Sequence, residues 1–327
     1  MNMINNEILV SIVIPAYNEE KYIGMCLQSL SELEFDKDKL EIIVVDNGST
    51  DRTLEIARSY TSNVIIKEKV KVGAVRNYGV SHAKGKYIVF LDSDCVVDKQ
   101  WLSRGINKLQ KDSKLVLGGQ YLMRESPSWL EKYWVLTNSV EKIYQTTLVG
   151  GCIFIENKTF ESVAGFNENL NSGEDSDLTY RLIQADFTVN IDPSLSVIHM
   201  GYPSEILPFI KRQIWHSSDY ITSLKKSLKD KIFILTLCFM IGVITFTSGL
   251  LFHGHFNLLF LLLMVTPPAL LSYKRISRSQ TTYTGFFDVI SIYAVDWLYL
   301  IGRTCGILLS FKNALANPAK DQKVDIR

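Results

Sequence analysis

Several common signatures are absent from this sequence of 327 residues, and each absence argues against a class of protein. There is no Gly-x-Gly-x-x-Gly fingerprint, which argues against an NAD or FAD enzyme, and no Walker phosphate loop, which argues against an ATPase. A strong net charge is also lacking: the formal charge is +1, so we expect no nucleic-acid partner. Internal repeats and low-complexity tracts are absent too.

Cysteine is scarce, and its five copies do not have the Cys-x-x-Cys spacing of metal sites. Their odd number and scattered positions favour reduced thiols in a cytosolic compartment. A signal peptide is not expected either, because the first residues are polar and the first apolar run is as short as a strand.

Apolar runs that end abruptly in polar residues are the main positive feature, at residues 8–14, 40–45 and 87–91. Continuous apolar strands that alternate with helical stretches predict a parallel sheet covered on both faces. In such sheets ligands bind beyond the carboxyl ends of the strands. We therefore expect the polar residues after these runs to share one binding edge.

The third run ends in Asp92-Ser93-Asp94. Side chains i and i+2 of a strand lie on the same face, so we expect both carboxylates to point to one place. Two hard oxygen ligands beside phosphate oxygens suit Mg²⁺ or Mn²⁺. An isolated Asp-x-Asp is more often a solvated loop tip, but the neighbouring strand ends favour a metal site. Asp46, after the second run, is suited to a ribose hydroxyl or a base N–H, although a turn-forming Asp is the alternative. Together these acids predict a nucleotide-diphosphate site.

Six segments resemble the motifs of family 2 glycosyltransferases, in the order of that family and within roughly residues 8–200. They are residues 11–20, 44–51, 76–79, 91–94, 150–151 and 173–178. The resemblance implies a GT-A fold, which is an α/β fold with a mixed, mainly parallel sheet flanked by helices. It also implies a nucleotide-sugar donor.

The resemblance further implies a set of donor-binding residues. Asp46 would contact the base or the ribose, and Arg76 the diphosphate or the sugar, since a guanidinium is a natural phosphate partner. An exposed helical arginine is the alternative for Arg76. Gly150 and Gly151 would let the backbone approach the donor sugar closely. The remaining donor-binding candidates are Pro15, Tyr17, Glu19, Asp92 and Ser93.

A divalent cation, Mn²⁺ or Mg²⁺, would neutralise charge on the departing nucleoside diphosphate. In similar enzymes the second acid, here Asp94, contacts the metal more directly than the first, Asp92. His199 follows the apolar run 195–198 and could add a third ligand, although a lone histidine at a strand end is often structural.

Residues 174–177 read Glu-Asp-Ser-Asp and open a predicted helix that runs to about residue 185. Acids in a first helical turn favour the macrodipole and the cap, but three acids exceed what a cap needs. The resemblance assigns Asp175 as the general base that takes the proton of an acceptor hydroxyl. One base and one stabilised leaving group imply direct displacement, which inverts the anomeric centre.

The sequence gives only weak signals for residues that contact the acceptor. Glu174, Arg212 and Trp215 are the candidates, but residues 211–216 depart from the Gln-x-x-Arg-Trp motif of processive synthases, which argues against processive polymerisation. Ser126-Pro127 predicts an N-cap with Pro at the first helical position, in front of an aromatic-rich helix.

The last hundred residues predict a membrane region, 225–327, after a catalytic domain of residues 1–224. Residues 232–252 and 256–273 are uncharged, and 21 residues span about 30 Å, the hydrocarbon thickness of a bilayer. Lysines and arginines flank this pair of predicted spans on the outside and are lacking in the turn 253–255. The positive-inside rule therefore places the catalytic domain in the cytosol, at the inner membrane of the cell.

The third apolar stretch, 286–311, contains Asp288, Asp296 and Arg303 near one helical face. It is either an amphipathic helix in the interface or a third span with its polar face against the other two. The basic tail that follows favours a cytosolic C-terminus, and we favour the interfacial or re-entrant interpretation.

The expected function is metal-dependent, inverting transfer of a sugar from a nucleotide sugar to a hydroxyl of a lipid-linked glycan at the cytosolic membrane face. A polyprenyl-phosphate sugar synthase is the first alternative. Its acceptor is already a phosphate and has little need of a base, so Glu174-Asp175 argues against it. A non-catalytic nucleotide-sugar binding protein is the second alternative.

Overall fold

The computed structural model describes residues 7–136, 146–217, 220–221, 227–249, 251, 258–279 and 285–316. The chain forms two compact units. The first contains Met1–Arg124 and Asn138–Tyr202, and the second contains Glu125–Thr137 and Pro203–Arg327. This division differs from the expected one at residue 224, because two amphipathic segments ahead of that residue pack with the C-terminal helices.

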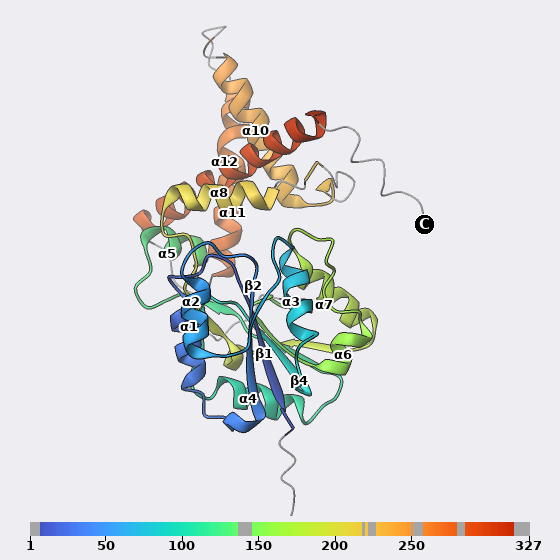
Figure 1. Ribbon diagram of the computed structural model, residues 1–327. Helices are drawn as coiled ribbons and strands as arrows, with labels where there is room; N and C mark the ends of the chain where they lie inside the picture. Colours follow the sequence, from blue (N-terminus) through green and yellow to red (C-terminus); the bar gives the residue numbers. More distant parts are fainter. Residues whose placement is uncertain are drawn as a thin grey trace, which may run out of the picture. The chain divides into compact units, whose positions relative to one another are not determined.

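The first unit is built on a seven-stranded sheet with the order β3-β2-β1-β4-β8-β6-β9 (Figure 1). Its first four strands in this order are parallel: β3 (Val64–Ile66), β2 (Leu40–Asp46), β1 (Val10–Ala16) and β4 (Tyr87–Leu91). The other three are β8 (Cys152–Glu156), antiparallel to both neighbours, β6 (Leu115–Gly118), and β9 (Thr188–Ile191), parallel to β6. The predicted mixed, mainly parallel sheet is thus confirmed.

A second, three-stranded sheet has the order β5-β10-β7. Its strands are β5 (Cys95–Val96), β10 (Val197–His199) and β7 (Tyr121–Leu122). The antiparallel pairing of β10 with β5 sets His199 opposite Cys95. Because Cys95 comes directly after Asp94, this small sheet carries a distant histidine to the loop that follows β4.

Helices cover both faces of the large sheet, as the apolar strands require. On one face lie α1 (Ile23–Ser31), α2 (Thr53–Tyr60) and α4 (Trp101–Leu109). On the other lie α3 (Val72–Val80), α6 (Asn157–Ser162) and α7 (Glu174–Gln184). Alternation along β1 feeds both cores, since Ile12 and Ile14 pack on the first face and Val13 on the second.

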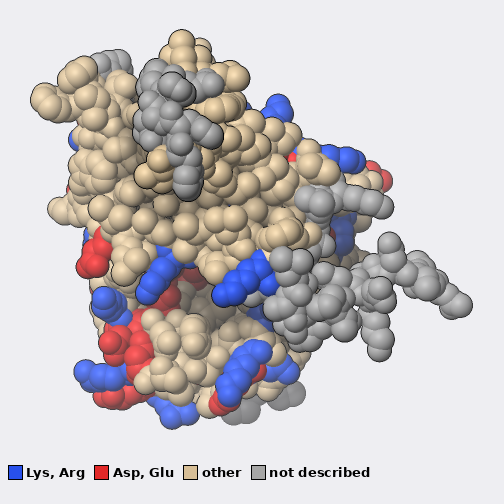
Figure 2. Space-filling view, turned by 90° about the horizontal axis from the view of Figure 1, so that it is seen from above, with Lys and Arg blue, Asp and Glu red and all other residues tan. Residues whose placement is uncertain are grey.

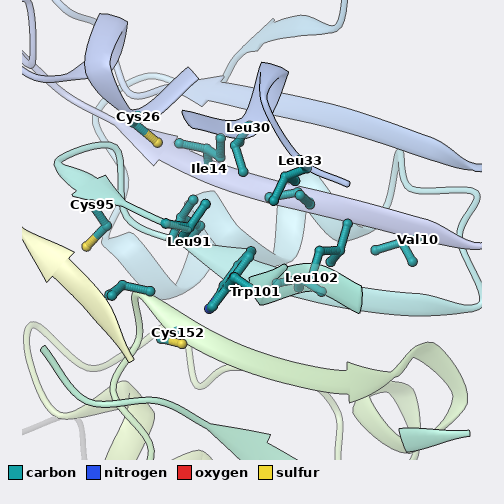
Figure 3. Packing of buried hydrophobic residues seen from close by; sticks show 14 of the residues in the cluster. Val10, Ile14, Cys26, Leu30, Leu33, Leu91, Cys95, Trp101, Leu102 and Cys152 are labelled. Carbon is teal, nitrogen blue, oxygen red and sulfur yellow. The ribbon is translucent and has the colours of Figure 1, made fainter. Parts of the chain in front are cut away.

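Three cysteines belong to the first of these cores. Cys26, Cys95 and Cys152 are fully buried among side chains of α1, α4 and the sheet (Figure 3). Each is a free thiol, and burial raises the pKa of the Cys152 thiol to about 12. These thiols are therefore poor nucleophiles and serve as small apolar residues.

The second unit is helical, and three of its helices are long and apolar enough to cross a membrane by length and composition. Its described helices include α5 (Trp129–Val135), α8 (Ile206–Ser217), α10 (Lys231–Ser248), α11 (Leu258–Arg278) and α12 (Phe286–Ala316). Figure 2 shows a broad surface without charged side chains. Exposed apolar residues of the three long helices include Ile241, Leu262 and Leu308. The predicted turn 253–255 lies outside the described residues.

The start of α5 corrects one prediction. The N-cap is Ser128 rather than Ser126, and Ser128 forms a capping box with Glu131. Glu131 N donates to Ser128 Oγ (3.2 Å), and Ser128 N donates to a Glu131 carboxylate oxygen (2.7 Å). Two reciprocal hydrogen bonds outweigh the preference of Pro127 for the first helical position.

Candidate active site

Polar residues meet beyond the carboxyl ends of β1, β2 and β4, as expected. The parallel register aligns Ala16 of β1 with Asp46 of β2, so the loops that follow leave the sheet side by side. They are tied together, since Asn18 N donates to Ser49 Oγ (2.9 Å) and Thr50 N donates to Asn18 Oδ1 (2.8 Å). Two strand ends thus form one rigid rim.

Asp46 has one carboxylate oxygen committed and one available. Its Oδ2 accepts hydrogen bonds from Gly48 N and Ser49 N, both at 2.9 Å, and Gly48 adopts the positive φ of 88° that this turn needs. The side chain is fully buried, and Oδ1 has no hydrogen-bond partner among the residues that the structure describes. A buried acceptor without a partner is costly, so this oxygen is suited to a ligand N–H or O–H.

Pro15 is the last residue but one of β1, and Tyr17 and Glu19 lie on the loop that follows it. Tyr17 is exposed, whereas Glu19 is partly buried. Burial and then the charges of Asp94 and Asp92 raise the pKa of Glu19 to about 8. The glutamate therefore lies in the same negative field as the acid pair, and a cation there would lower its pKa again.

The acid pair lies in a turn after β4 and not on the strand itself, so strand alternation does not describe it, and its two carboxylates contact different side chains. Strand β4 ends at Leu91, and Cys95 N donates to the Asp92 carbonyl (3.0 Å), so Asp92 and Asp94 lie in a turn. Asp92 contacts Arg76 and Tyr121, while Asp94 lies against His199. Ser93, between them, is buried.

Arg76 connects the acid pair to the start of α7. Its guanidinium donates to Asp92 Oδ1 and to Glu174 Oε1, both at 2.7 Å, and it is only 3% exposed. Burial disfavours the charge, but Asp92 and Glu174 outweigh it and raise the pKa of Arg76. The exposed-helix alternative for Arg76 is thus wrong, because the residue is a buried tie between two carboxylates. Its contact with the diphosphate or the sugar stays a prediction.

Tyr121 is a site residue that no sequence motif indicated. Its hydroxyl donates to Asp92 Oδ2 (2.7 Å) and accepts from Gly151 N (3.0 Å). A Cβ on Gly151 would lie 2.3 Å from Asp92 Oδ2, and one on Gly150 would lie 2.5 Å from the Arg76 guanidinium. These two glycines therefore leave room for the protein's own polar groups.

Asp175 stands in the first turn of α7, next to this network. Its Oδ2 accepts from Gly150 N (3.2 Å) and its Oδ1 from Ser176 N (2.7 Å). Burial and then the neighbouring charge of Glu174 raise the pKa of Asp175. A carboxylate whose pKa is raised is a stronger proton acceptor than an ordinary aspartate. By contrast, Asp177 is bound to Arg181 (2.8 Å) on the outside of the helix.

The residues suggested for a cation fit it in part. Asp94 Oδ2 and His199 Nε2 are 3.3 Å apart, close enough to serve one ion as two ligands. Both oxygens of Asp92 are used by Arg76 and Tyr121. Among the described residues no three His, Cys, Asp or Glu side chains are grouped to hold a metal ion. The protein thus offers an incomplete set of ligands for the ion. This is typical of a site in which phosphate oxygens of a bound substrate supply the remaining ligands.

The three weak candidates for acceptor contacts belong to different units of the chain. Glu174 is buried against Arg76. Arg212 and Trp215 lie on α8 in the second unit, where Trp215 is 52% exposed.

Comparison with known proteins gives two family matches. The model described as Glycosyl transferase family 2 matches residues 11–155, and the one described as Glycosyl transferase family group 2 matches residues 87–307. The chain is 28% identical to Glycosyltransferase AglE of Haloferax volcanii over 246 residues, 71% of this chain and 80% of that protein. It is 31% identical to the poly(ribitol-phosphate) beta-N-acetylglucosaminyltransferase TarS of Staphylococcus aureus over 191 residues, 52% of this chain but only 32% of TarS.

A solved structure shares the fold. Mannosyltransferase PcManGT from Pyrobaculum calidifontis, in complex with GDP-Man and Mn²⁺, superimposes with a TM-score of 0.53. The superposition covers 96% of this chain and 88% of that chain at 17% identity.

Proposed function

Because the chain belongs to glycosyl transferase family 2 and has the GT-A fold, it transfers a sugar from a nucleotide sugar, and we propose an inverting, metal-dependent reaction on a hydroxyl acceptor. The family resemblance drawn from the motifs is confirmed. The observation that carries the proposal is the placement of Asp175, a partly buried carboxylate of raised pKa, beside the Arg76 network that leads to the acid pair.

The donor is proposed to bind along the rim formed by the first two strand ends. Asp46 Oδ1 accepts a hydrogen bond from the base or the ribose, since no described residue of the protein is its partner. Pro15, Tyr17 and Glu19 line the same rim, and Ser93 and Gly151 lie near the diphosphate and sugar. The rigid pairing of the two loops orients the nucleotide before reaction, which reduces the entropy lost on binding.

Asp94 and His199 are proposed to hold Mn²⁺ or Mg²⁺ together with diphosphate oxygens of the donor. The ion supplies Lewis-acid stabilisation of charge on the leaving nucleoside diphosphate. Asp92 orients this site without binding the ion directly, because Arg76 and Tyr121 fix both of its oxygens.

Asp175 is proposed to accept the proton of the acceptor hydroxyl as that oxygen attacks the anomeric carbon. The hydrogen bonds from Gly150 N and Ser176 N fix the direction of its carboxylate. The C–O bond to the sugar forms as the bond to the diphosphate breaks, so the anomeric centre inverts.

The acceptor is proposed to be a lipid-linked glycan at the cytosolic face of the inner membrane. The support is the apolar α10 and α11, with basic residues at the outer ends of the pair. The positive-inside rule puts those ends in the cytosol.

A thermal-shift screen of nucleotide sugars, with and without Mn²⁺, tests the proposal. A ligand at a hundredfold excess over its Kd stabilises by about 2.7 kcal/mol, a shift that is readily measured. The expected result is one nucleotide sugar whose shift depends on Mn²⁺, followed by inverted product with a hydroxyl acceptor. A Mn²⁺-independent shift contradicts the metal proposal. Transfer to polyprenyl phosphate as sole acceptor instead supports a polyprenyl-phosphate sugar synthase.

A further inference from the structure

The long helix α12 has one charged face, and each of its three charged side chains has a partner within the second unit. Asp288, Asp296 and Arg303 follow each other at intervals of eight and seven residues, which sets them on one side of the helix. Their partners are, in order, the Tyr133 hydroxyl (2.7 Å), the Arg275 guanidinium (2.5 Å) and the Tyr220 hydroxyl (3.1 Å).

Helices α10 and α11 form an antiparallel pair (Figure 1), and two of these partners lie at the same end of it. Arg275 lies in the basic last turn of α11. Tyr220 donates to Asp230 (3.0 Å), which is the N-cap of α10. Hence the charged face of α12 contacts both helices at the end with the basic flanks.

The packing of α10 on α11 shows that these ends are level. A Cβ on Gly242 of α10 would lie 2.5 Å from the backbone N of Met264 of α11, so the two helices meet closely there. At 1.5 Å per residue, Asp230 and Arg275 are each about 17 Å along their helices from this contact. Both therefore lie at one end of the pair.

The direction of α12 follows from the spacing of its contacts. Between Asp296, at the end of α11, and Arg303, near the end of α10, it advances about 10 Å. That is the usual distance between the axes of two packed helices. The helix thus passes from the end of one helix to the end of the other, across the pair. A third span would instead run along the pair and lie about 10 Å deeper after the same seven residues.

Helix α8 lies alongside α12 (Figure 1). The contact is close because α12 has glycine at two positions one turn apart: a Cβ on Gly302 would lie 2.6 Å from Gln213 Cβ, and one on Gly306 would lie 2.0 Å from Ser217 Oγ. Away from this contact α8 exposes Leu207 and Trp215, an apolar and an amphipathic side chain.

The outward face of α12 is apolar from Phe287 to Leu308, ahead of Lys312. Phe287, Ile290, Ile301 and Leu308 are exposed along it, without an intervening charge on that stripe. A helix of 31 residues is about 46 Å long, well beyond the roughly 30 Å of hydrocarbon that a straight span needs. A long apolar face opposite a charged, protein-paired face is the pattern of a helix in the plane of the membrane interface.

We propose that α12 and α8 lie in the boundary between head groups and acyl chains of one leaflet, and that only α10 and α11 cross the membrane. The partner of the exposed stripe is the lipid surface. This inference rests on the membrane attachment proposed above.

Spin labels on α12 test it by their depth in vesicles of phosphatidylcholine and phosphatidylglycerol. Single cysteines replace Ala294 and Ile301 in a Cys238→Ser/Cys305→Ser background, in which the remaining thiols are buried in the first core. The matched control is a second pair of single-cysteine variants, labelled at Ile234 and Ile241 of α10, which are also seven residues apart. Collision rates with oxygen and with a water-soluble nickel complex give the depth of each label.

The expected result is equal, shallow depth for labels 294 and 301, against a difference of about 10 Å between labels 234 and 241. A similar difference on α12 would overturn the in-plane proposal alone. Water exposure of the labels on α10 would overturn the membrane attachment itself. As a second readout, protease should reach tags at both termini from the same side of sealed vesicles, whereas a third span would separate them.

Discussion

Replacement of Asp175 by asparagine is the most direct test of the proposed chemistry. The amide has the shape of the carboxylate and can still accept one of its two hydrogen bonds, from Gly150 N or Ser176 N. It cannot take a proton from an acceptor hydroxyl. The nucleotide is held elsewhere in the proposed site, at Asp46 and Asp94. The change should therefore affect turnover and leave donor binding in place.

The size of the expected fall in kcat can be estimated. A positioned acid or base contributes about 10²–10⁴ in rate, or about 2.7–5.5 kcal/mol of activation free energy. We expect kcat of the Asp175→Asn variant to fall by this factor. Calorimetric binding of the nucleoside diphosphate with Mn²⁺ should change less than about threefold, since no hydrogen bond to the nucleotide is removed.

Asp177→Asn is the matched control. Asp177 is two residues further along α7, about 200° around the helix, and is bound to Arg181. Its loss should change kcat little. If the Asp177 variant is inactive and the Asp175 variant retains turnover, the wrong carboxylate has been assigned. If the Asp175 variant no longer binds the nucleotide, the start of α7 belongs to the donor site.

The pH profile gives an independent check. The base must be ionised, so activity is lost as the pH falls through the raised pKa of Asp175. The charge of Glu174 is the second cause of that rise, after burial. Glu174→Gln removes this charge, so the acidic limb of kcat/KM should move to lower pH. A limb that stays in place or moves to higher pH contradicts the assignment.

Three further outcomes are expected. Asp94→Ala should lose Mn²⁺-dependent nucleotide binding in calorimetry while circular dichroism shows an intact fold; unchanged Mn²⁺-dependent affinity would remove Asp94 from the site. Gly201→Ala should have the same effect, because its Cβ would lie 1.8 Å from Asp94 Oδ2, whereas Gly24→Ala, whose Cβ meets Ile56 at an ordinary 3.5 Å, should not. Tyr121→Phe should cost about 1–3 kcal/mol of stability, seen as a lower Tm, since Asp92 Oδ2 and Gly151 N each lose a partner; an unchanged Tm would argue against the network.

The sequence predicted the strands and the binding edge well, because the physical signals there are local. Apolar runs followed by acids mark β1, β2 and β4, and the parallel arrangement then follows from alternation with helices. The capping box Ser128-x-x-Glu131 was also a readable local signal, and the competing proline at 127 concealed it.

What could not be predicted depends on contacts between distant segments. Strand alternation does not describe Asp92 and Asp94, because β4 ends at Leu91 and each acid contacts a different partner from a distant segment. Tyr121 has no motif around it, and it reaches Asp92 only through the fold. The buried position of Arg76 requires Glu174, which is 98 residues away.

This last pairing has a consequence for synthesis on the ribosome. Arg76 and Asp92 leave the exit tunnel well before Glu174, and domains fold as their residues emerge. Until α7 has been made, the buried guanidinium has only one of its two carboxylates, and Asp175 does not yet exist. Because a domain folds as a unit, the rim, the ion pair and the proposed base are expected to form together, once α7 and the strands after it have been made. A nascent chain stalled ahead of residue 174 lacks the proposed base and one of the two carboxylates of Arg76.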